Sequence, residues 1–320
     1  MKNQISIQKI VVIGPRTDIG KCILGHLAQH AFPVTAIRAL DIHQDAGKSI
    51  DYNNHRLITQ ALDSFDFHGN HIVFVCDRKL IPLLYQHNKD LQSWWIDCTH
   101  FVHNAVCVIP DINGAILQTH PKWICNPCSC VIALLHILMP IVTTYKVQSI
   151  ELVPLLGTLF QGPEATDILM SQIRHCLIQT PIAKRDPAPQ LAFSVIPDYF
   201  STLSKIIERQ IHCFITPPVL VRTCFVPVVR GSCTYVQIRL SRNCRVQHLI
   251  QKWQKSPYIR VIQGTSMTGL NEILAEEKIF ILQPVMQNAI LSFWCMQDVV
   301  QQGMGTNAAA LAKYLYEISA

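Results

Sequence analysis

Three closely spaced cysteines, Cys125, Cys128 and Cys130, are the side chains of this chain best suited to chemistry. Between them stands an Asn126–Pro127 pair, which is typical of a turn, and the apolar run from Ser129 onward predicts a helix. A helix N-terminus stabilises a thiolate or a bound anion, because its free N–H groups and the positive end of its dipole lie there. The stretch could therefore supply a nucleophilic thiol, an anion site, or soft ligands for a metal ion.

Metal binding is the weakest of these possibilities. Structural zinc prefers tetrahedral sets of cysteine and histidine, and the histidines that could complete such a set are His100, His103 and His120. However, the chain has no second C-x-x-C pair, and its 13 cysteines are scattered through apolar contexts such as 74–76. We therefore predict no metal site, and buried, reduced thiols of the kind found in cytoplasmic proteins.

The composition is that of a globular chain with a large core. Of 320 residues, 49% are hydrophobic and 15% are charged, which favours a large buried interface and hence an oligomer. The formal charge of +6 is spread without a block of lysine or arginine, so the sequence does not indicate nucleic-acid binding. No apolar run is long enough to span a bilayer, and residues 1–8 lack a hydrophobic signal-peptide region. We expect a cytoplasmic protein that binds neither membranes nor nucleic acid.

A strand, a glycine-bounded turn and a helix follow one another near the start of the chain. Residues 10–14 form a short β-branched run that predicts a buried parallel strand, and residues 21–27 have helical spacing. This order is typical of the first unit of a Rossmann-like dinucleotide-binding fold, although a plain strand-to-helix turn would look the same. The candidate cofactor-binding residues of the turn are Gly14, Thr17, Asp18, Ile19 and Gly20.

Three further segments predict strands of the same parallel sheet. They cover residues 34–40, 71–76 and 94–97 and are rich in apolar side chains. After the first of them comes a polar loop in which Gln44 and Lys48 are further candidates for cofactor binding. The loop could equally be an exposed connection without a ligand.

These segments resemble, in the same order, the landmarks of the aspartate-semialdehyde dehydrogenase family. Residues 125–134 resemble the family's active-site segment N-P-N-C-S-T-I-Q-L, and residues 192–197 are similar to its A-F-N-V-I-P. Residues 223–233 resemble T-C-x-R-V-P-V-x-R-G-H-S, and residues 298–309 resemble D-N-L-x-K-G-A-A-x-N-A. The resemblance covers nearly the whole chain.

The resemblance implies an α/β fold with two domains. Residues 1–128 would form a Rossmann-like NAD(P)-binding domain, to which a C-terminal helix over residues 299–320 would return. Residues 129–298 would form an α+β dimerisation domain, because the family builds a large dimer interface from the corresponding sheet. The expected partner is a second copy of this chain, or a true dehydrogenase in a heterodimer.

The family's cofactor motifs are only partly kept. In its turn, G-x-x-G-x-x-G, the middle glycine lets the main chain approach the pyrophosphate, and Thr17 stands in its place. The family's loop A-S-x-R-S-A-G-K keeps Lys48, but Gln44 replaces the arginine and Asp45 the second serine. A carboxylate near a ribose suits a free 2′-OH and repels a 2′-phosphate. The expected cofactor is therefore NAD or NADP, or none.

The family's catalytic residues are absent from the positions that the resemblance assigns to them. Ser129 stands in place of the nucleophilic cysteine, and Leu156 in place of the glutamine that orients the substrate. Phe225 replaces the arginine that binds the substrate carboxylate, and Ser232 replaces the general-base histidine. A serine needs an adjacent base to become nucleophilic. We therefore predict no catalytic residue, and a non-catalytic protein similar to the Usg-type paralogues.

Two alternatives remain open. A one-residue slip would make Cys128 or Cys130 the nucleophile of an active NAD(P)-dependent oxidoreductase for an aldehyde or acyl phosphate in amino-acid biosynthesis. One residue rotates a helical side chain by about 100°, so such a thiol would point away from the family's reaction centre. The other alternative is a regulator that senses NAD-type nucleotides.

Overall fold

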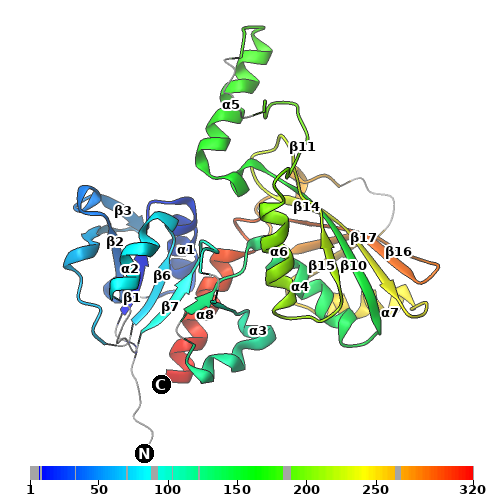
Figure 1. Cartoon of the computed structure of the whole chain (residues 1–320), viewed down its shortest axis with the longest axis horizontal. Helices are drawn as coiled ribbons and strands as arrows, with labels where there is room; N and C mark the ends of the chain where they lie inside the picture. Colours follow the sequence, from blue (N-terminus) through cyan, green and yellow to red (C-terminus); the bar gives the residue numbers. More distant parts are fainter. Residues whose placement is uncertain are drawn as a thin grey trace, which may run out of the picture. The chain divides into compact units, whose positions relative to one another are not determined.

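The computed structural model describes residues 7, 9–32, 34–69, 71–87, 93–102, 104–121, 123–182, 189–263 and 268–319. The chain forms two compact units, whose elements are labelled in Figure 1. Unit 1 comprises Met1–Cys128 and Gly303–Ala320, and unit 2 comprises Ser129–Gln302. The cofactor-binding and dimerisation roles expected of them stay predictions. His103, one of the metal ligands considered, lies outside the described residues.

Unit 1 is built around a seven-stranded parallel sheet in the order β5-β2-β1-β6-β7-β9-β8. The strand order reverses between β1 and β6, which makes this the topological switch point, where doubly wound folds bind ligands. The strands are β1 (Lys9–Ile13), β2 (Ile37–Asp41), β5 (Gln60–Ala61), β6 (His71–Val75), β7 (Trp94–Asp97), β8 (Val106–Cys107) and β9 (Trp123–Cys125), with a separate hairpin of β3 (Ser49–Tyr52) and β4 (His55–Ile58). The helices are α1 (Asp18–Gln29), α2 (Ile81–His87), α3 (Pro110–Asn113) and α8 (Met304–Ser319), with the 3-10 turns η1 (Val34–Ala36), η2 (His43–Asp45), η3 (Leu62–Ser64), η4 (Arg78–Leu80) and η5 (Gly114–Thr119).

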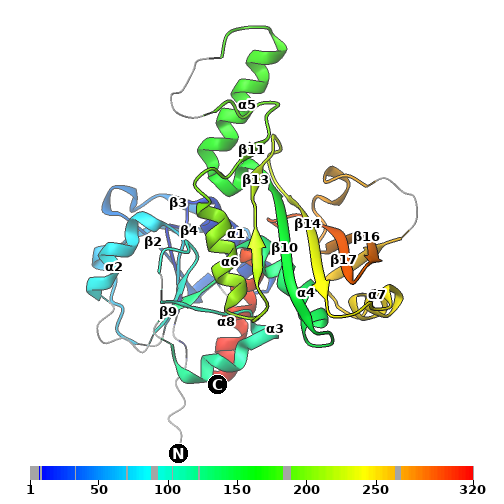
Figure 2. The same cartoon turned by 45° about the vertical axis from the view of Figure 1, so that its right-hand side comes forward.

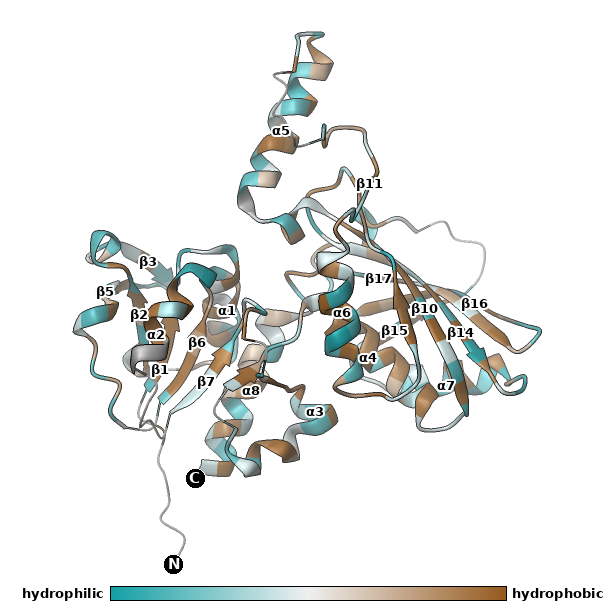
Figure 3. Ribbon diagram, in the orientation of Figure 1, coloured by the Kyte–Doolittle hydropathy of each residue, from teal (hydrophilic) through white to brown (hydrophobic). Residues whose placement is uncertain are grey.

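Both faces of this sheet are buried, as is usual for parallel strands. Alternate residues of β1 enter different apolar clusters: Ile10 and Val12 enter one, and Val11 and Ile13 enter the other. The first cluster also contains side chains of α1 and α8, and the second contains side chains of α2. Figure 3 accordingly shows the central strands of unit 1 as largely hydrophobic. This two-sided burial explains why the predicted strands were apolar without alternation.

The strands predicted in unit 1 form, with one correction. The predicted ranges 10–14, 71–76 and 94–97 agree with β1, β6 and β7 to within one residue at each end. The strand predicted over residues 34–40 begins only at Ile37, because Ile37 pairs with Ile10 next to the start of β1. The residues directly before Ile37 form η1 instead.

The C-terminal helix lies in unit 1, but the predicted range 299–320 starts too early. The helix begins at Met304. The residues before it form a turn in which Val300 N donates a hydrogen bond to the Asp298 carboxylate and Gln302 N donates one to Asp298 O. Asn126, buried after β9, holds the start of the helix. Its Nδ2 donates to Met304 O at 2.9 Å, and its Oδ1 accepts from Asn307 Nδ2 at 2.9 Å. The Asn-Pro turn thus fastens α8 to the sheet.

Unit 2 is built around an eight-stranded mixed sheet in the order β11-β13-β10-β14-β17-β16-β15, with β12 also paired to β10. Its strands are β10 (Val147–Leu156), β11 (Ile196–Pro197), β12 (Val219–Val221), β13 (Cys224–Phe225), β14 (Ser232–Leu240), β15 (Ile259–Ile262), β16 (Ile279–Gln287) and β17 (Ile290–Gln297). Its helices are α4 (Ser129–Val142), α5 (Pro163–Leu177), α6 (Thr202–His212) and α7 (Val246–Gln254), with the 3-10 turns η6 (Thr158–Gln161) and η7 (Asn271–Ile273). The helix predicted after the Asn-Pro turn is α4, which confirms that prediction. In both Figure 1 and Figure 2, α5 extends away from the sheet.

The two faces of the unit 2 sheet differ in burial. On one face, side chains such as Leu152, Val236 and Phe293 are fully buried. Trp253 of α7 packs against Phe293 with 5.3 Å between ring centroids, and its Nε1 donates to Ile137 O of α4 at 3.1 Å. This face therefore forms the core of unit 2, beneath α4 and α7.

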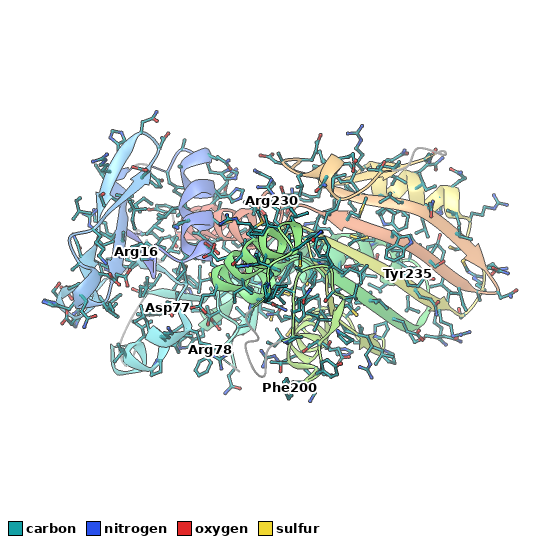
Figure 4. The ribbon with its side chains drawn as sticks, turned by 90° about the horizontal axis from the view of Figure 1, so that it is seen from above. Arg16, Asp77, Arg78, Phe200, Arg230 and Tyr235 are labelled. Atoms are coloured by element: carbon teal, nitrogen blue, oxygen red, sulfur yellow. The ribbon has the colours of Figure 1, made fainter. Side chains whose placement is uncertain are left out.

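The opposite face, named here the open face, carries partly exposed apolar side chains. Val153, Tyr235, Trp294 and Leu282 follow one another across four paired strands. The rings of Tyr235 (labelled in Figure 4) and Trp294 lie 5.2 Å apart. Across the described residues, no helix combines the length and the apolar character needed to cross a membrane.

Candidate functional site

Ser129, which the resemblance places at the nucleophile position, is the first residue of α4 and is buried. Its Oγ donates to Val299 O at 3.4 Å, so the hydroxyl is directed toward a main-chain carbonyl. Cys128 and Cys130, the fallback thiols, flank it in sequence and are also buried. The helix start is where the sequence predicted it, but its side chains are packed rather than presented to solvent.

Three further predicted positions lie side by side in one row of the unit 2 sheet. Leu156, the last residue of β10, pairs with Phe225 of β13 on one side and with Ser232 of β14 on the other. Side chains at paired positions project from the same face of a sheet. The structure therefore brings together Leu156, Phe225 and Ser232, although they are far apart in the sequence. Their side chains are a hydrocarbon chain, an aromatic ring and a hydroxyl.

The same row contains Gln297, which the sequence analysis did not single out. Gln297 of β17 pairs with Ser232 and is only 2% exposed. Its Oε1 is buried and has no hydrogen-bond partner within the described part of the chain. A strand prediction over residues 290–297 would have placed Gln297 on the buried face and flagged it as an unusual core residue.

Beside the row, Arg230 and Asp298 form an ion pair, with 2.6 Å between Arg230 Nη2 and Asp298 Oδ2. Asp298 is fully buried and also accepts hydrogen bonds from Ala275 N at 2.8 Å and from Val300 N at 3.0 Å. The carboxylate therefore joins three segments of unit 2 that are distant in sequence. We assign this pair a structural role, because every acceptor atom of Asp298 already has a partner.

In unit 1, the turn between β1 and α1 needs both of its predicted glycines. Gly14 has φ of 73°, and a Cβ there would lie 2.8 Å from Asp77 Cβ. A Cβ at Gly20 would lie 2.4 Å from Gly14 O, because the helix starts directly against the strand. The turn is therefore as tight as in dinucleotide-binding folds. Whether Gly14 and Gly20 contact a cofactor stays a prediction.

Thr17, at the position of the family's middle glycine, caps α1. Its Oγ1 accepts a hydrogen bond from Gly20 N at 3.0 Å and donates one to Gly14 O at 2.8 Å. The Thr17 hydroxyl thereby occupies an N–H group that a pyrophosphate would otherwise take. Asp18 and Ile19 form the first turn of the helix, and the Asp18 carboxylate adds negative charge there. The helix start is well capped but a weaker anion site than an uncapped one.

Asp45, in η2, forms ion pairs with two basic side chains, those of Arg16 and Lys48. Its Oδ1 lies 2.8 Å from Arg16 Nη1 (Figure 4 labels Arg16) and also pairs with Lys48 Nζ. The hydrogen bond from Lys48 and the charge of Arg16 lower the pKa of Asp45. Gln44, the other predicted residue, is exposed. Asp45 therefore neutralises the charges of Arg16 and Lys48.

Asp41 is a candidate that the sequence analysis missed. It is the last residue of β2, is buried, and accepts a hydrogen bond from Ile42 N at 2.9 Å. Burial is the main cause that raises the pKa of Asp41. An acidic residue at the end of the second strand, about twenty positions after the last glycine of the turn, hydrogen-bonds the ribose 2′-OH in NAD-binding folds. That spacing from Gly20 was readable in the sequence.

The turn after β6 carries three charged side chains, those of Asp77, Arg78 and Lys79. The Asp77 carboxylate accepts a hydrogen bond from Lys79 N at 2.9 Å and starts η4. The guanidinium of Arg78 lies 4.7 Å from the centre of the Phe101 ring, where it makes a cation–π contact. Figure 4 labels Asp77 and Arg78. Asp77 also lies against Gly14, because its main-chain N and Cβ are the atoms that a Cβ at Gly14 would meet.

The cysteine stretch does not gather metal ligands. Cys125 Sγ lies 4.0 Å from His100 Nδ1, which joins two of the predicted ligands. His120 instead stacks on Trp94, with 4.6 Å between ring centroids. Over the described ranges, no group of three or more His, Cys, Asp or Glu side chains could hold a metal ion.

Relatives of this chain occur among curated proteins, although no protein-family model matches it. The chain is 22% identical to an aspartate-semialdehyde dehydrogenase of Synechocystis sp., over 97% of each sequence. It is 20% identical to a USG-1 protein homolog of Pseudomonas aeruginosa, over 96% of this chain and 97% of the relative. Both kinds of relative span the whole length of the chain.

Solved structures with the same fold extend this comparison. A probable aspartate-semialdehyde dehydrogenase from Pseudomonas aeruginosa has a TM-score of 0.89 at 19% identity, over 97% of this chain and 98% of that one. The aspartate semialdehyde dehydrogenase II of Vibrio cholerae has a TM-score of 0.85 at 18% identity, with the same coverage. The enzyme of Candida albicans, solved with NADP, has a TM-score of 0.67 at 12% identity and covers 97% of this chain and 98% of that one. The predicted α/β fold, with a Rossmann-like parallel sheet and a second, mixed sheet, is confirmed.

Proposed function

We propose that this chain, a distant member of the aspartate-semialdehyde dehydrogenase family, is a non-catalytic protein that keeps the fold without the reaction. The observation that carries the proposal is the row Phe225–Leu156–Ser232. These side chains stand where the resemblance predicts an arginine, a glutamine and a histidine. A phenyl ring and an isobutyl group cannot pair with a carboxylate, and a serine hydroxyl cannot take a proton at neutral pH.

Ser129 does not compensate for the missing thiolate. Its hydroxyl is buried and donates toward Val299 O, and a serine becomes nucleophilic only when a base removes its proton. Loss of one group that stabilises a transition state costs roughly a hundredfold to a thousandfold in rate. Because Ser129, Leu156, Phe225 and Ser232 all lack the group that the resemblance assigns to their positions, none of these four residues can carry its part of the family's chemistry.

Turnover of aspartate semialdehyde tests this proposal. With phosphate and either NAD or NADP, we expect the purified chain to reduce no nicotinamide above the rate of the buffer. A combined variant, with S129C, L156Q, F225R and S232H, tests whether the fold still supports the reaction once the groups return. Nicotinamide reduction by the unaltered chain would contradict the proposal.

The competing function is an active oxidoreductase that uses Cys128 or Cys130. It is favoured by the position of both thiols at the start of α4, where a helix dipole stabilises a thiolate. Their burial disfavours it. A panel of aldehydes with the C128S and C130S variants distinguishes the two functions, because turnover that one substitution abolishes would establish the enzyme.

We further propose that a nucleotide bound by unit 1 carries a free 2′-OH, as NAD does. Asp45 supports this, because its carboxylate neutralises Arg16 and Lys48 and would repel a 2′-phosphate. Asp41 supports it as well, because it ends β2 where NAD-binding folds hold the ribose.

Calorimetric titration with NAD and NADP tests this part of the proposal. We expect NAD to bind more tightly, and D45S to raise the affinity for NADP about tenfold by releasing the two cations. D51S, on the exposed hairpin strand β3, removes the same charge and should change neither affinity. Failure of every nucleotide to bind at millimolar concentration would exclude both hydride transfer and nucleotide sensing.

We also propose that unit 2 mediates self-association through its open face, as a homodimer or as a heterodimer with a true dehydrogenase. The support is the apolar row Val153–Tyr235–Trp294–Leu282, whose side chains remain partly exposed. Rows of this kind at the centre of a sheet face are typical of protein interfaces.

A further inference from the structure

A cavity of about 370 Å³ lies within unit 2, between α5 and the segment 189–200. Phe225 forms part of its wall, next to Ile196, with which it pairs in the sheet. Gln172 of α5 fastens the two sides together, because its Oε1 accepts hydrogen bonds from Leu191 N at 2.8 Å and from the following main-chain N–H at 3.0 Å. Figure 2 labels α5 and β11, the elements on either side. The volume falls in the range of small-molecule sites.

The wall and rim of this cavity are aromatic and aliphatic. Tyr199 and Phe200 line it although they are 81% and 88% exposed, and Phe225 lies deeper. Phe200 is labelled in Figure 4. Ile168 and Leu191 add aliphatic surface. Two adjacent aromatic side chains that remain in water are unusual, and an apolar ligand body would cover them.

The described side chains that line this cavity include acidic groups. Among the described residues that line it, the ionisable groups with charge at neutral pH are Glu164 and Asp198, and both are acidic. Asp198 Oδ2 caps α6 by accepting from Leu203 N and Ser204 N. Glu164 forms no hydrogen bond or ion pair within the described part of the chain. Its side chain is exposed and lines the cavity, so a ligand there can reach the carboxylate.

We propose that this cavity binds a small organic ammonium ion with an apolar or aromatic body. The ammonium group would pair with Glu164, and aromatic faces attract cations as well as apolar groups. A carboxylate of the same shape would be repelled by both acidic residues. The inference goes beyond the proposed function, because the binding that it describes needs neither turnover nor a second copy of the chain: every side chain that it uses lines one cavity of a single chain.

Titration of the full chain with three matched probes tests the proposal: 2-phenylethylamine, 2-phenylethanol and 3-phenylpropionate. At neutral pH we expect the amine to bind most tightly and the carboxylate most weakly, with about a threefold difference at each step. E164Q should weaken the amine about threefold and leave the alcohol unchanged. D167N is the matched control, because Asp167 is an exposed carboxylate of the same helix that does not line the cavity.

A second variant tests the apolar wall. F225L keeps an apolar side chain but removes the ring, so all three probes should bind more weakly, while the partial exposure of Phe225 keeps the shift of the unfolding midpoint small. The proposal is overturned if no probe binds at millimolar concentration, or if the carboxylate binds as tightly as the amine. It is also overturned if E164Q and D167N have the same effect. Turnover of an aldehyde by a chain that prefers the amine would contradict only the proposed function.

Discussion

Asp41 keeps a carboxylate at the end of β2 where little water reaches it. Burial is the largest cause that raises its pKa above the ordinary value of 3.8, and the hydrogen bond from Ile42 N opposes it. The charges of Asp45 and Asp77 add to the rise. Because desolvation penalises the ionised form, the folded chain carries an unfavourable negative charge at neutral pH.

We therefore predict that D41N stabilises the chain at neutral pH. The folded chain binds more protons than the unfolded chain between pH 3.8 and the raised pKa of Asp41, so stability falls as the pH rises through this interval. The free energy of unfolding of D41N should exceed that of the unaltered chain at pH 7. The difference should disappear as the pH falls to 3.8, as measured by urea denaturation across this range.

D66N is the control of opposite sign. Hydrogen bonds from the main-chain N–H and ring of His68 lower the pKa of Asp66, so its ionised form favours the folded chain. Its stabilisation is present above pH 3.8 and is lost as the pH falls through the lowered value. D66N should therefore be no more stable than the unaltered chain at pH 7. A gain for D41N that persisted unchanged at pH 3.8 would show that ionisation is not its cause.

The residues of the candidate site differ in how far sequence could predict them. The glycines of the turn were recognisable because their spacing reflects steric need at Gly14 and Gly20. The pairing of Asp45 with Arg16 was not, since it depends on how two loops meet. Asp41 was overlooked because it becomes a candidate only when β2 is known to end there. Gln297 was overlooked because its burial depends on which face of β17 is packed in the core.

The Thr17 hydroxyl caps the start of α1, and the T17A variant should show how much this cap contributes to the free energy of unfolding. Removing a threonine cap costs about 1 kcal/mol of stability. T17S keeps the hydroxyl and should cost little. If the cap also competes with a nucleotide, T17G should raise the affinity for NAD, because it frees Gly20 N, while T17S should not. Denaturation and calorimetry measure the two effects separately, and equal NAD affinity in T17G and T17S would refute the competition.

The packing of α1 on α8 depends on a glycine. A Cβ at Gly305 would lie 2.6 Å from Cys22 Sγ and 2.3 Å from His26 Cδ2. G305A should therefore destabilise unit 1 by about 1–3 kcal/mol through overpacking. Gly25 is the matched control in α1, because a Cβ there meets nothing within 4 Å.

For Gly25 the expected sign is opposite. G25A should stabilise α1 by about 1 kcal/mol, since alanine is the better helix former. Thermal or urea denaturation of the two variants measures both changes. A stabilising G305A would contradict the close packing of the two helices.

At the scale of elements, the sequence predicted the strands and helices whose presence depends on a local pattern of apolar residues. The apolar runs of β1, β6 and β7 and the helix after the Asn-Pro turn were evident. The start of β2 was wrong, because register with β1 decides it, and the start of α8 was wrong, because the turn around Asp298 delays it. Which strands of unit 2 are neighbours, such as β10 between β13 and β14, required the three-dimensional fold.

On the scale of the whole molecule, the open face is the surface that we expect a second copy of the chain to cover, because its aromatic side chains are partly exposed. Tyr235 and Trp294 pack against each other and remain partly exposed, whereas Leu152, Val236 and Phe293 on the other face of the sheet are buried. A stable interface typically buries about 800 Å² on each partner around such aromatic residues. The substitutions at the catalytic positions do not touch this face, so association can persist where the reaction is lost.

W294R tests whether this face joins two copies of the chain. Sedimentation velocity of the unaltered chain should show a dimer, and a buried, unpaired arginine at the centre of the interface should weaken it by about a hundredfold or more. The side chain is partly exposed in the single chain, so W294R should still fold. L177R, at the 74% exposed end of α5, introduces the same side chain away from the sheet and should leave the dimer intact. A monomeric unaltered chain, or a dimer that survives W294R, would contradict self-association through the open face. Ligand binding would then be the remaining proposed role of the chain.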